Sequence, residues 1–361
     1  MNKHTLPLLP PSIDLETKLV LRKLAVAHRY LAELKGVVGT IPNEAILINT
    51  LTLQEAKDSS EIENIITTHD EIYKSSLFED VIQGSSTKEV SRYAKALRAG
   101  FSSVKESGLI TTNLIISLYQ ELEQNDGGLR SQAGTTLKNQ TTGEIIYTPP
   151  QDYNDVIHLM TNLEKFINDN SMLDADPLVK MAVIHHQFES IHPFYDGNGR
   201  TGRIINILYL VAQGLLDIPI LYLSGYIIQT KQKYYELLQL VRDHNSWEEW
   251  LIYILEGIEY TSRTTISLVV EIRTLMQKYK HGIRSELPKI YSQELINNLF
   301  NHPYTKIEYL QRDLNISRLT ASKYLSLLDK HGFVKKQKMG RYNYYINEPL
   351  FKLFVAPPLS A

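Results

Sequence analysis

The sequence contains no cysteine, which excludes disulfide bonds and thiolate metal sites. It has no apolar run that approaches the ~20 residues of a membrane-spanning helix, so no membrane partner is expected. The first residues lack the continuous apolar stretch of a secretory signal. The formal net charge is only −2, so charge alone indicates no nucleic-acid partner. We therefore expect a cytoplasmic protein.

Length and composition are those of an ordinary globular protein. The 361 residues are enough for two or three domains, and 43% of them are hydrophobic while 22% are charged. The charge is uneven, because residues 285–361 contain 11 Lys and Arg but only 6 Asp and Glu. The remaining chain contains 27 and 34 of these residues. An acidic body followed by a basic C-terminal region indicates distinct partners.

The stretch from His192 to Arg203 reads His-Pro-Phe-Tyr-Asp-Gly-Asn-Gly-Arg-Thr-Gly-Arg, and it is the most informative part of the chain. Asp176 and Pro177 predict the start of a helix that runs to about residue 190. A second apolar helix is expected from about Arg200. The glycine-rich residues between them therefore lie just before a helix N-terminus, where backbone N–H groups and the helix dipole attract anions.

The side chains of this stretch complete the set that holds a metal-bound polyphosphate and attacks it. A carboxylate suits Mg²⁺, arginines fork onto phosphate oxygens, and a histidine takes a proton from an attacking hydroxyl. We predict His192 as the catalytic base and Asp196 as the metal ligand. The predicted phosphate contacts are Gly197, Asn198, Gly199, Arg200 and Arg203.

With these residues, the stretch resembles the Fic family signature, His-x-Phe-x-(Asp/Glu)-Gly-Asn-Gly-(Lys/Arg)-x-x-Arg, at every defining position. The resemblance implies a protein adenylyltransferase that moves AMP from ATP to Tyr, Thr or Ser hydroxyls of target proteins and of itself, with Mg²⁺ as cofactor. Some members of the family transfer UMP or phosphocholine, or phosphorylate, and the motif does not choose among these reactions. The unaltered Gly-Asn-Gly favours AMP. We also expect a homodimer.

A β-hairpin is expected at residues 137–147, with its turn near Asn139–Gly143, followed by Pro149 and Pro150. It resembles the flap on which Fic enzymes dock target proteins by strand addition. The alternative is a purely structural hairpin.

The stretch Ser59-Ser-Glu-Ile-Glu-Asn64 resembles the Fic inhibitory motif, (Ser/Thr)-x-x-x-Glu-(Gly/Asn), in which Ser59, Glu63 and Asn64 match. Ser59 and Glu63 are four positions apart, so the two share one helical face. The resemblance implies that Glu63 pairs with Arg203 and blocks productive placement of the γ-phosphate. The alternative is a set of solvated helix charges.

Two tyrosines after the motif, Tyr234 and Tyr235, are candidates for a wall of the adenine pocket, because aromatic faces stack on bases. Helix–helix packing is the alternative. Asn206 lies about one turn beyond Arg203 and is expected to face the same cleft. The neighbouring His185 and His186 are expected to be structural.

The rest of the chain has mostly helical periodicity. Helices are expected at about residues 15–36, 43–59, 90–107 and 112–124, and again from about Asn154. The tail at 285–350 has the pattern of a winged helix, with helices at about 292–301, 306–314 and 318–331 and strands at 333–338 and 341–346. We expect Thr305 and Ser317 to cap the second and third helices. Exposed basic residues, among them Lys323, Lys336 and Arg341, would contact DNA phosphates, and a protein-interaction module is the alternative.

The predicted fold is mainly α: a helical Fic core with a small β-hairpin flap, followed by a C-terminal winged helix-turn-helix domain. We predict an N-terminal helical region at 1–105, a catalytic domain at 106–284 and a winged-helix domain at 285–361. The predicted function is an autoinhibited protein adenylyltransferase that releases pyrophosphate. The alternative is a nucleotide-sensing transcription regulator.

Overall fold

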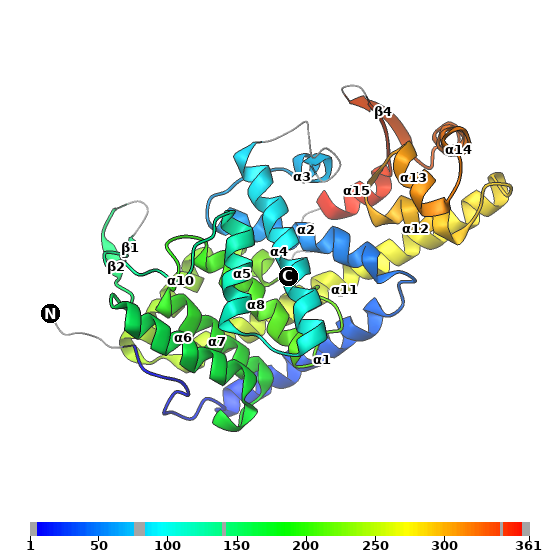
Figure 1. The fold of residues 1–361 in the computed structure, drawn as a ribbon. Coiled ribbons are helices and arrows are strands. Elements are labelled where there is room, and N and C mark those ends of the chain that lie inside the picture. The colour runs from blue at the N-terminus through cyan, green and yellow to red at the C-terminus, as the bar shows by residue number, and fades with distance from the viewer. Residues whose placement is uncertain (1–5, 76–83, 139–141, 340–341, 356–361) are drawn as a thin grey trace.

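The computed structural model describes residues 6–75, 84–138, 142–339 and 342–355, and these are mainly helical (Figure 1). The first helices are α1 (Lys18–Val38), α2 (Glu44–Ile62), α3 (His69–Ser75), α4 (Ser85–Ser107) and α5 (Thr112–Glu123). The strands β1 (Leu137–Lys138) and β2 (Ile145–Tyr147) precede α6 (Tyr153–Asn168) and a short 3-10 helix, Asn170–Met172. Then follow α7 (Pro177–Ile191), α8 (Asn198–Ala212), α9 (Leu223–Gln229), α10 (Lys231–His244) and α11 (Trp247–Glu286). The mainly helical prediction is confirmed.

Two buried helices, α7 and α8, form the centre of the body. Every residue of α7 from Leu178 to Ile191 is buried, so this helix has apolar neighbours on all sides. It starts as predicted, with Pro177 at the first helical position and the Asp176 carboxylate accepting the N–H of Leu178 at 2.8 Å. The second helix, α8, begins at Asn198, two residues earlier than expected. The connecting loop is therefore short and is held between two rigid elements.

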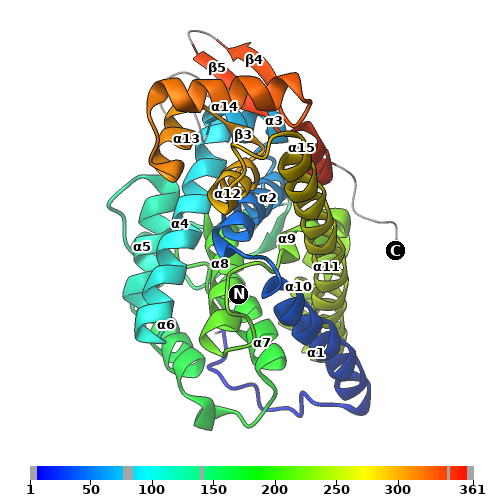
Figure 2. The same ribbon diagram turned by 90° about the vertical axis from the view of Figure 1, so that its right-hand side faces the viewer.

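The other helices surround this pair. Helix α11 runs along the molecule, with α1 lying against it (Figure 2). Forty residues at ~1.5 Å each make α11 about 60 Å long. On the opposite side α4 contacts both α5 and α8, while α2 lies between α4 and α9. Helix α2 extends to Ile62, one turn beyond the predicted end, and this places Glu63 at its C-terminus. None of the described helices combines the length and apolar character required to cross a bilayer.

The predicted hairpin is present as two short antiparallel strands, in which Leu137 pairs with Tyr147 and Lys138 with Ile145. Part of its predicted turn, residues 139–141, lies outside the described residues. The Tyr147 hydroxyl donates to the backbone oxygen of Ser190 at 2.9 Å, and the Arg242 guanidinium lies over its ring. These contacts attach the hairpin to the end of α7.

The C-terminal part contains α12 (Gln293–Asn301), β3 (Tyr304–Thr305), α13 (Ile307–Leu314), α14 (Arg318–Lys330), β4 (Lys335–Met339), β5 (Tyr342–Ile346) and α15 (Glu348–Val355). Three helices and an antiparallel sheet of order β3-β5-β4 give the expected winged-helix arrangement. Strand β3 and helix α15 were not predicted. Ser317 caps α14 as expected, but the prediction for Thr305 was wrong. Its hydroxyl donates to Asn298 instead, and Lys306 precedes α13 without a side-chain cap.

The predicted domain boundaries both fall in the last turns of helices. Helix α4 crosses residue 105, and α11 crosses residue 284 before it ends at Glu286. The long helix α11 therefore belongs to the body and also supports the C-terminal part. The division at 105 and 284 stays a prediction.

Candidate active site

His192 ends helix α7 in a left-handed conformation, with φ of 50°. This conformation turns the chain sharply into the loop, and only a few non-glycine residues adopt it. Burial lowers the pKa of His192 to about 4, and the nearby Arg130 and Arg242 act in the same direction. The imidazole is therefore neutral at neutral pH, which is the form that accepts a proton.

Arg130 fixes the position of His192, and the sequence analysis missed it. Its buried guanidinium donates through Nε to the His192 backbone oxygen at 2.7 Å and also bonds the backbone oxygen of Pro150. The backbone N–H of Arg130 donates to the backbone oxygen of Pro193 at 2.9 Å. One arginine thus joins the end of α7 to the segment after the hairpin. The available signal in the sequence was an arginine two residues after the glycine pair at 127–128.

The loop is closed by Asn198, which was predicted to contact the nucleotide. Its side-chain oxygen accepts the N–H of Phe194 and its amide donates to the oxygen of the same residue, both at 2.9 Å. Phe194 is buried and stacks on Tyr119 with ring centroids 4.0 Å apart. The Asn198 amide therefore shapes the loop, and its contact with a nucleotide stays a prediction.

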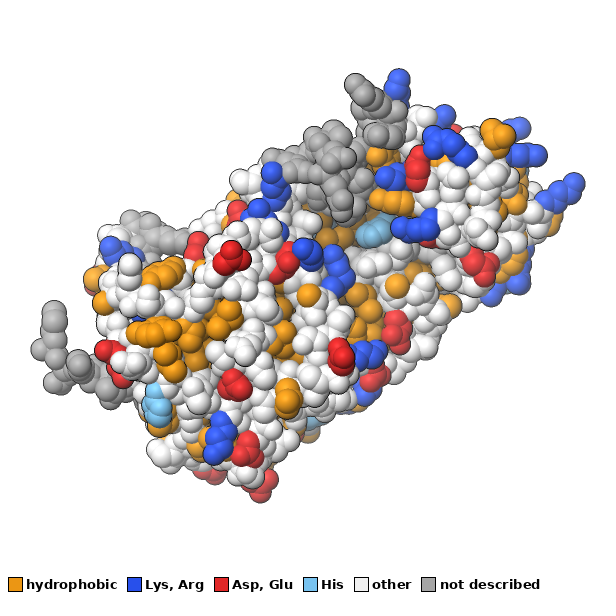
Figure 3. All heavy atoms as spheres, viewed as in Figure 1, with side chains coloured by type: hydrophobic (Ala, Val, Ile, Leu, Met, Phe, Trp, Pro, Cys, Tyr) orange, Lys and Arg blue, Asp and Glu red, His pale blue; other side chains and the backbone are white. Residues whose placement is uncertain are grey.

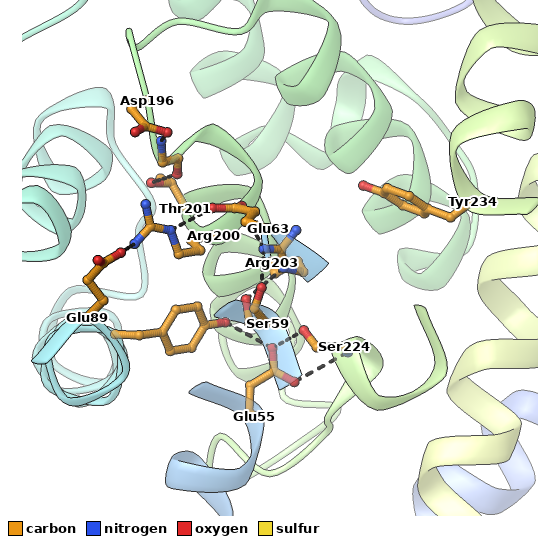
Figure 4. A network of polar contacts seen from close by, with 12 residues as sticks. Glu55, Ser59, Glu63, Glu89, Asp196, Arg200, Thr201, Arg203, Ser224 and Tyr234 are labelled. Carbon is orange, nitrogen blue, oxygen red and sulfur yellow. Dashed lines mark hydrogen bonds and ion pairs between the residues drawn. The ribbon is translucent and has the colours of Figure 1, made fainter. Parts of the chain in front are cut away.

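The two arginines of the motif share one carboxylate, that of Glu63 (Figure 4). Arg203 Nη2 donates to Glu63 Oε1 at 2.9 Å, as the resemblance implied. Arg200 Nε also donates to Glu63 Oε2 at 2.7 Å, a contact that was not predicted. The side chains of Arg200 and Arg203 are only 3% and 2% exposed, so both charges depend on these partners.

The residues predicted to be inhibitory lie together at the end of α2. Ser59 lies one turn before Glu63, and its hydroxyl and backbone oxygen accept from Arg203 at 2.7 and 2.8 Å. Asn64 follows in a left-handed conformation with φ of 64°, which favours Asn or Gly. Glu61 instead pairs with Lys57 at 2.7 Å. The two neighbouring glutamates therefore have different partners.

Two further carboxylates hold Arg200, and sequence reasoning missed both. Glu89 on α4 accepts from Nη1 at 3.2 Å, and Glu123 at the end of α5 accepts from Nη2 at 2.8 Å. These glutamates come from helices far from the motif in sequence. No local pattern could have identified them, because only the packing of α4 and α5 against α8 brings them to Arg200.

The carboxylates lie directly over the glycines of the motif. A methyl group at Gly199 would come within 2.6 Å of Glu63 Oε1, and one at Gly197 within 2.5 Å of Glu123 Oε1. Gly197 also has a φ of 67°, so two independent reasons favour glycine there. Negatively charged oxygens thus occupy the helix N-terminus at which phosphate was expected.

The predicted metal ligand, Asp196, lies in the loop with its side chain exposed. Its Oδ1 accepts the N–H of Gly197 at 2.7 Å. The described residues contain no cluster of three or more His, Cys, Asp or Glu that could hold a metal by itself. A single carboxylate beside an anion site fits Mg²⁺, which takes one or two carboxylates together with substrate phosphates.

The two candidate adenine-pocket tyrosines differ in exposure. Tyr234 is buried, and its hydroxyl lies 2.8 Å from His185 Nε2. Tyr235 is 47% exposed, so its ring is available to a ligand. Asn206 is buried on α8. Burial lowers the pKa of His185 to about 3. A role in adenine binding stays a prediction for both tyrosines.

The surface beside the hairpin is apolar. Figure 3 shows hydrophobic side chains gathered on the face that carries the hairpin and α6. The exposed large apolar residues of these elements are Ile145, Ile146, Tyr153 and Ile157. Exposed apolar patches of this kind mark protein-binding surfaces.

Comparisons with known proteins agree with this geometry. Residues 21–102 match the Fic/DOC family N-terminal model, residues 109–210 the Fic/DOC family model, and residues 275–350 the C-terminal domain of SoFic-like protein adenylyltransferases. A probable protein adenylyltransferase of Aquifex aeolicus is 28% identical over 255 residues, which are 68% of this chain and 72% of that protein. Protein adenylyltransferase fic-1 of Caenorhabditis elegans is 32% identical over 85 residues, 24% of this chain but only 16% of the relative.

Solved structures show the same fold. A Fic family protein from Desulfovibrio desulfuricans has a TM-score of 0.59 at 17% identity, over 94% of this chain and 98% of that one. A Fic domain containing signaling protein from Bacteroides thetaiotaomicron has a TM-score of 0.55 at 16% identity, over 68% of this chain and 96% of that one.

The chain belongs to the Fic/DOC family, because the family models cover its N-terminal helices and its motif and the fold agrees. Within that family it carries a C-terminal domain like that of the SoFic-like proteins.

Proposed function

We propose that this protein is an autoinhibited protein adenylyltransferase that transfers AMP from ATP to hydroxyl side chains of target proteins. One observation carries the proposal: the Glu63 carboxylate bridges two buried arginines at the N-terminus of α8. A carboxylate in that position marks an anion site, because helix N-termini and paired arginines bind phosphate in the same way. The names of the curated relatives, protein adenylyltransferases, support the same activity.

The proposed reaction uses the groups around this anion site. The triphosphate takes the place of the Glu63 carboxylate on Arg200 and Arg203. A target hydroxyl docks along the hairpin, and neutral His192 takes its proton as the oxygen attacks the α-phosphorus. The new oxygen–phosphorus bond forms as the bond to the β-phosphate breaks, and pyrophosphate leaves. Mg²⁺, when bound through Asp196, neutralises part of the phosphate charge.

The inhibited state follows from the same contacts. While Glu63 holds both arginines, its charge repels a triphosphate and its oxygens fill the space beside Gly199. Self-modification and homodimer formation are further proposals that rest on the resemblance, and the cytoplasmic location stays a prediction.

DNA binding by the C-terminal domain is a separate proposal. Figure 3 shows Lys and Arg side chains over this domain. Three of its described Lys and Arg side chains are already paired, Arg312 with Asp313, Arg318 with Glu308 and Lys335 with Glu348. The predicted wing residue Arg341 lies outside the described residues. The transcription-regulator alternative depends on this domain alone, so we favour the enzyme.

Labelled nucleotides test the proposal directly. The protein is incubated with a bacterial lysate and ATP labelled on either the α- or the γ-phosphate. AMP transfer leaves α-label but no γ-label on protein, whereas phosphorylation leaves the reverse. The Glu63→Gly variant supplies the uninhibited enzyme, and Glu63→Gly with His192→Ala supplies the matched inactive control. Absence of α-label with Glu63→Gly at saturating ATP and Mg²⁺ would contradict the proposed activity.

A further inference from the structure

The inhibitory segment, defined here as residues 44–75 with α2, α3 and their connection, is attached to the C-terminal domain on both sides of Glu63. Before Glu63, the Asn49 amide of α2 donates to Asn301 Oδ1 of α12 at 2.8 Å. After it, the Tyr304 hydroxyl of β3 donates to Asp70 Oδ1 of α3 at 2.6 Å. Figures 1 and 2 show α12 against α2 and α15 near α3.

An aromatic cluster strengthens the second attachment. Tyr73 of α3 is 1% exposed and lies among three rings of the C-terminal domain. Its ring centroid lies 6.5 Å from Tyr304, 6.2 Å from Phe351 and 5.9 Å from Phe354. Helix α3 has only seven residues, too few to be stable alone, so its position depends on this cluster together with its packing against α4.

The connection between Glu63 and α3 is short and hydrogen-bonded, so a displacement of α3 reaches Glu63. The Ile65 N–H returns to the Ser60 oxygen at 3.0 Å. Glu71 accepts from the Thr68 N–H and from the Thr67 hydroxyl, both at 3.0 Å, which closes the first turn of α3. These bonds hold the residues that follow Glu63 and the residues that start α3.

The joint between this segment and the C-terminal domain is incompletely packed. Among the described residues, a cavity of about 250 Å³ is lined by Asn49, Asn301 and Arg312. A second, of about 410 Å³, lies between the α2 residues Lys57 and Glu61 and the end of α15. Both cavities are partly open to solvent, so the joint is packed less completely than the core.

We propose that the C-terminal domain is a regulatory element that holds the inhibitory segment in place, so that loosening its attachment withdraws Glu63 from Arg200 and Arg203 and activates transfer. This inference rests on the proposed adenylyltransferase function. It assigns the C-terminal domain a role in controlling the active site, which lies on the other side of α2. Binding of any partner that displaces the domain would then activate the enzyme.

The test uses the full-length double variant Asn301→Ala with Tyr304→Phe, which removes one hydrogen bond on each side of Glu63. Both changes lie in the C-terminal domain, outside the active site. The matched control is Asn343→Ala with Tyr291→Phe, the same chemical changes at positions that have no hydrogen bond or ring contact with α2 or α3 among the described residues. Self-modification with α-labelled ATP and hydrogen exchange of residues 44–75 are measured for each.

We expect self-modification to rise about tenfold in the double variant, since two hydrogen bonds of ordinary strength are lost, and to be unchanged in the control. When the double variant is combined with Glu63→Gly, self-modification should not rise above that of Glu63→Gly alone. Exchange in α2 and α3 should accelerate. An active Glu63→Gly enzyme with a silent double variant would overturn the inference and leave the proposed function intact. If Glu63→Gly is itself inactive, the proposed function fails. Unchanged hydrogen exchange of residues 44–75 in the double variant would overturn the proposed attachment of this segment as well.

Discussion

Replacing Glu63 with glycine should activate the enzyme strongly. The substitution removes two charge-assisted hydrogen bonds, at 2.7 Å to Arg200 and 2.9 Å to Arg203. Bonds to charged groups contribute about 1.5–3 kcal/mol each, so the inhibited arrangement loses about 3–6 kcal/mol. The Glu63 side chain is 23% exposed, and screening by solvent favours the lower end of this range. An increase of about 100-fold in the transfer rate at subsaturating ATP is therefore expected.

The assay measures initial rates of α-label incorporation against ATP concentration. Most of the gain should come from tighter ATP binding, because the freed guanidinium groups receive the γ-phosphate. Without nucleotide the variant should melt at a lower temperature, since two buried arginines lose a partner, and MgATP should restore part of the loss. Glu63→Asp should stay mostly inhibited, and Arg203→Ala should abolish the gain. Equal rates for Glu63→Gly and wild type, or activation by Glu61→Gly instead, would refute this reading of the α2 terminus.

Four other outcomes are expected. In the Glu63→Gly background, His192→Ala should lower transfer by ~10²–10⁴-fold while calorimetry shows nearly unchanged ATP binding, and near-normal transfer would remove its assignment as base. Asp196→Ala should weaken ATP binding in the presence of Mg²⁺ but not in its absence. If calorimetry shows the same loss of ATP affinity with and without Mg²⁺, Asp196 has no role in binding the metal. Burial raises the pKa of Glu55 to about 8, although hydrogen bonds from Ser224 and Tyr93 lower that pKa. The folded protein therefore holds a proton that the unfolded chain loses, so the free energy of unfolding should fall as pH rises from about 4.5 to 8. Urea unfolding of Glu55→Gln should show a smaller dependence on pH. If the C-terminal domain binds DNA, Lys336→Ala should weaken binding to all duplexes and lower the salt slope by about one, whereas no binding at low salt would favour a protein-interaction module.

Local signals predicted the parts of this protein that depend on neighbours in sequence. Asp176 and Pro177 start α7 because an N-cap and a first-turn proline act within one helical turn. The motif from His192 to Arg203 also lies within a single loop and helix, so its composition was sufficient to indicate an anion site. Ser59 and Glu63 are one turn apart, and the pairing of Glu63 with Arg203 that the resemblance implied is present, whereas the bond from Arg203 to Ser59 was not predicted.

Errors and omissions occurred where tertiary contacts override local preference. Thr305 has the chemistry of a cap, but pairing in β3 and a bond to Asn298 use it otherwise. Tyr234 and Tyr235 are adjacent and chemically identical, yet one is buried against His185 and the other is half exposed. Periodicity alone could not separate them, because which face of α10 is covered depends on α11 and α9.

The sequence by itself determined the mainly α fold class through its helical periodicity, and it located the predicted anion site and the predicted inhibitory glutamate because each lies in a short contiguous motif. Only the tertiary structure decided which partners hold the arginines of that site. Arg200 meets carboxylates from the end of α2, from α4 and from α5, residues that lie 137, 111 and 77 positions away in the chain. Charges so distant in sequence become partners only when the burial of apolar helix faces brings their backbones together. The buried arginines then require them, because an unpaired charge in the protein interior is costly.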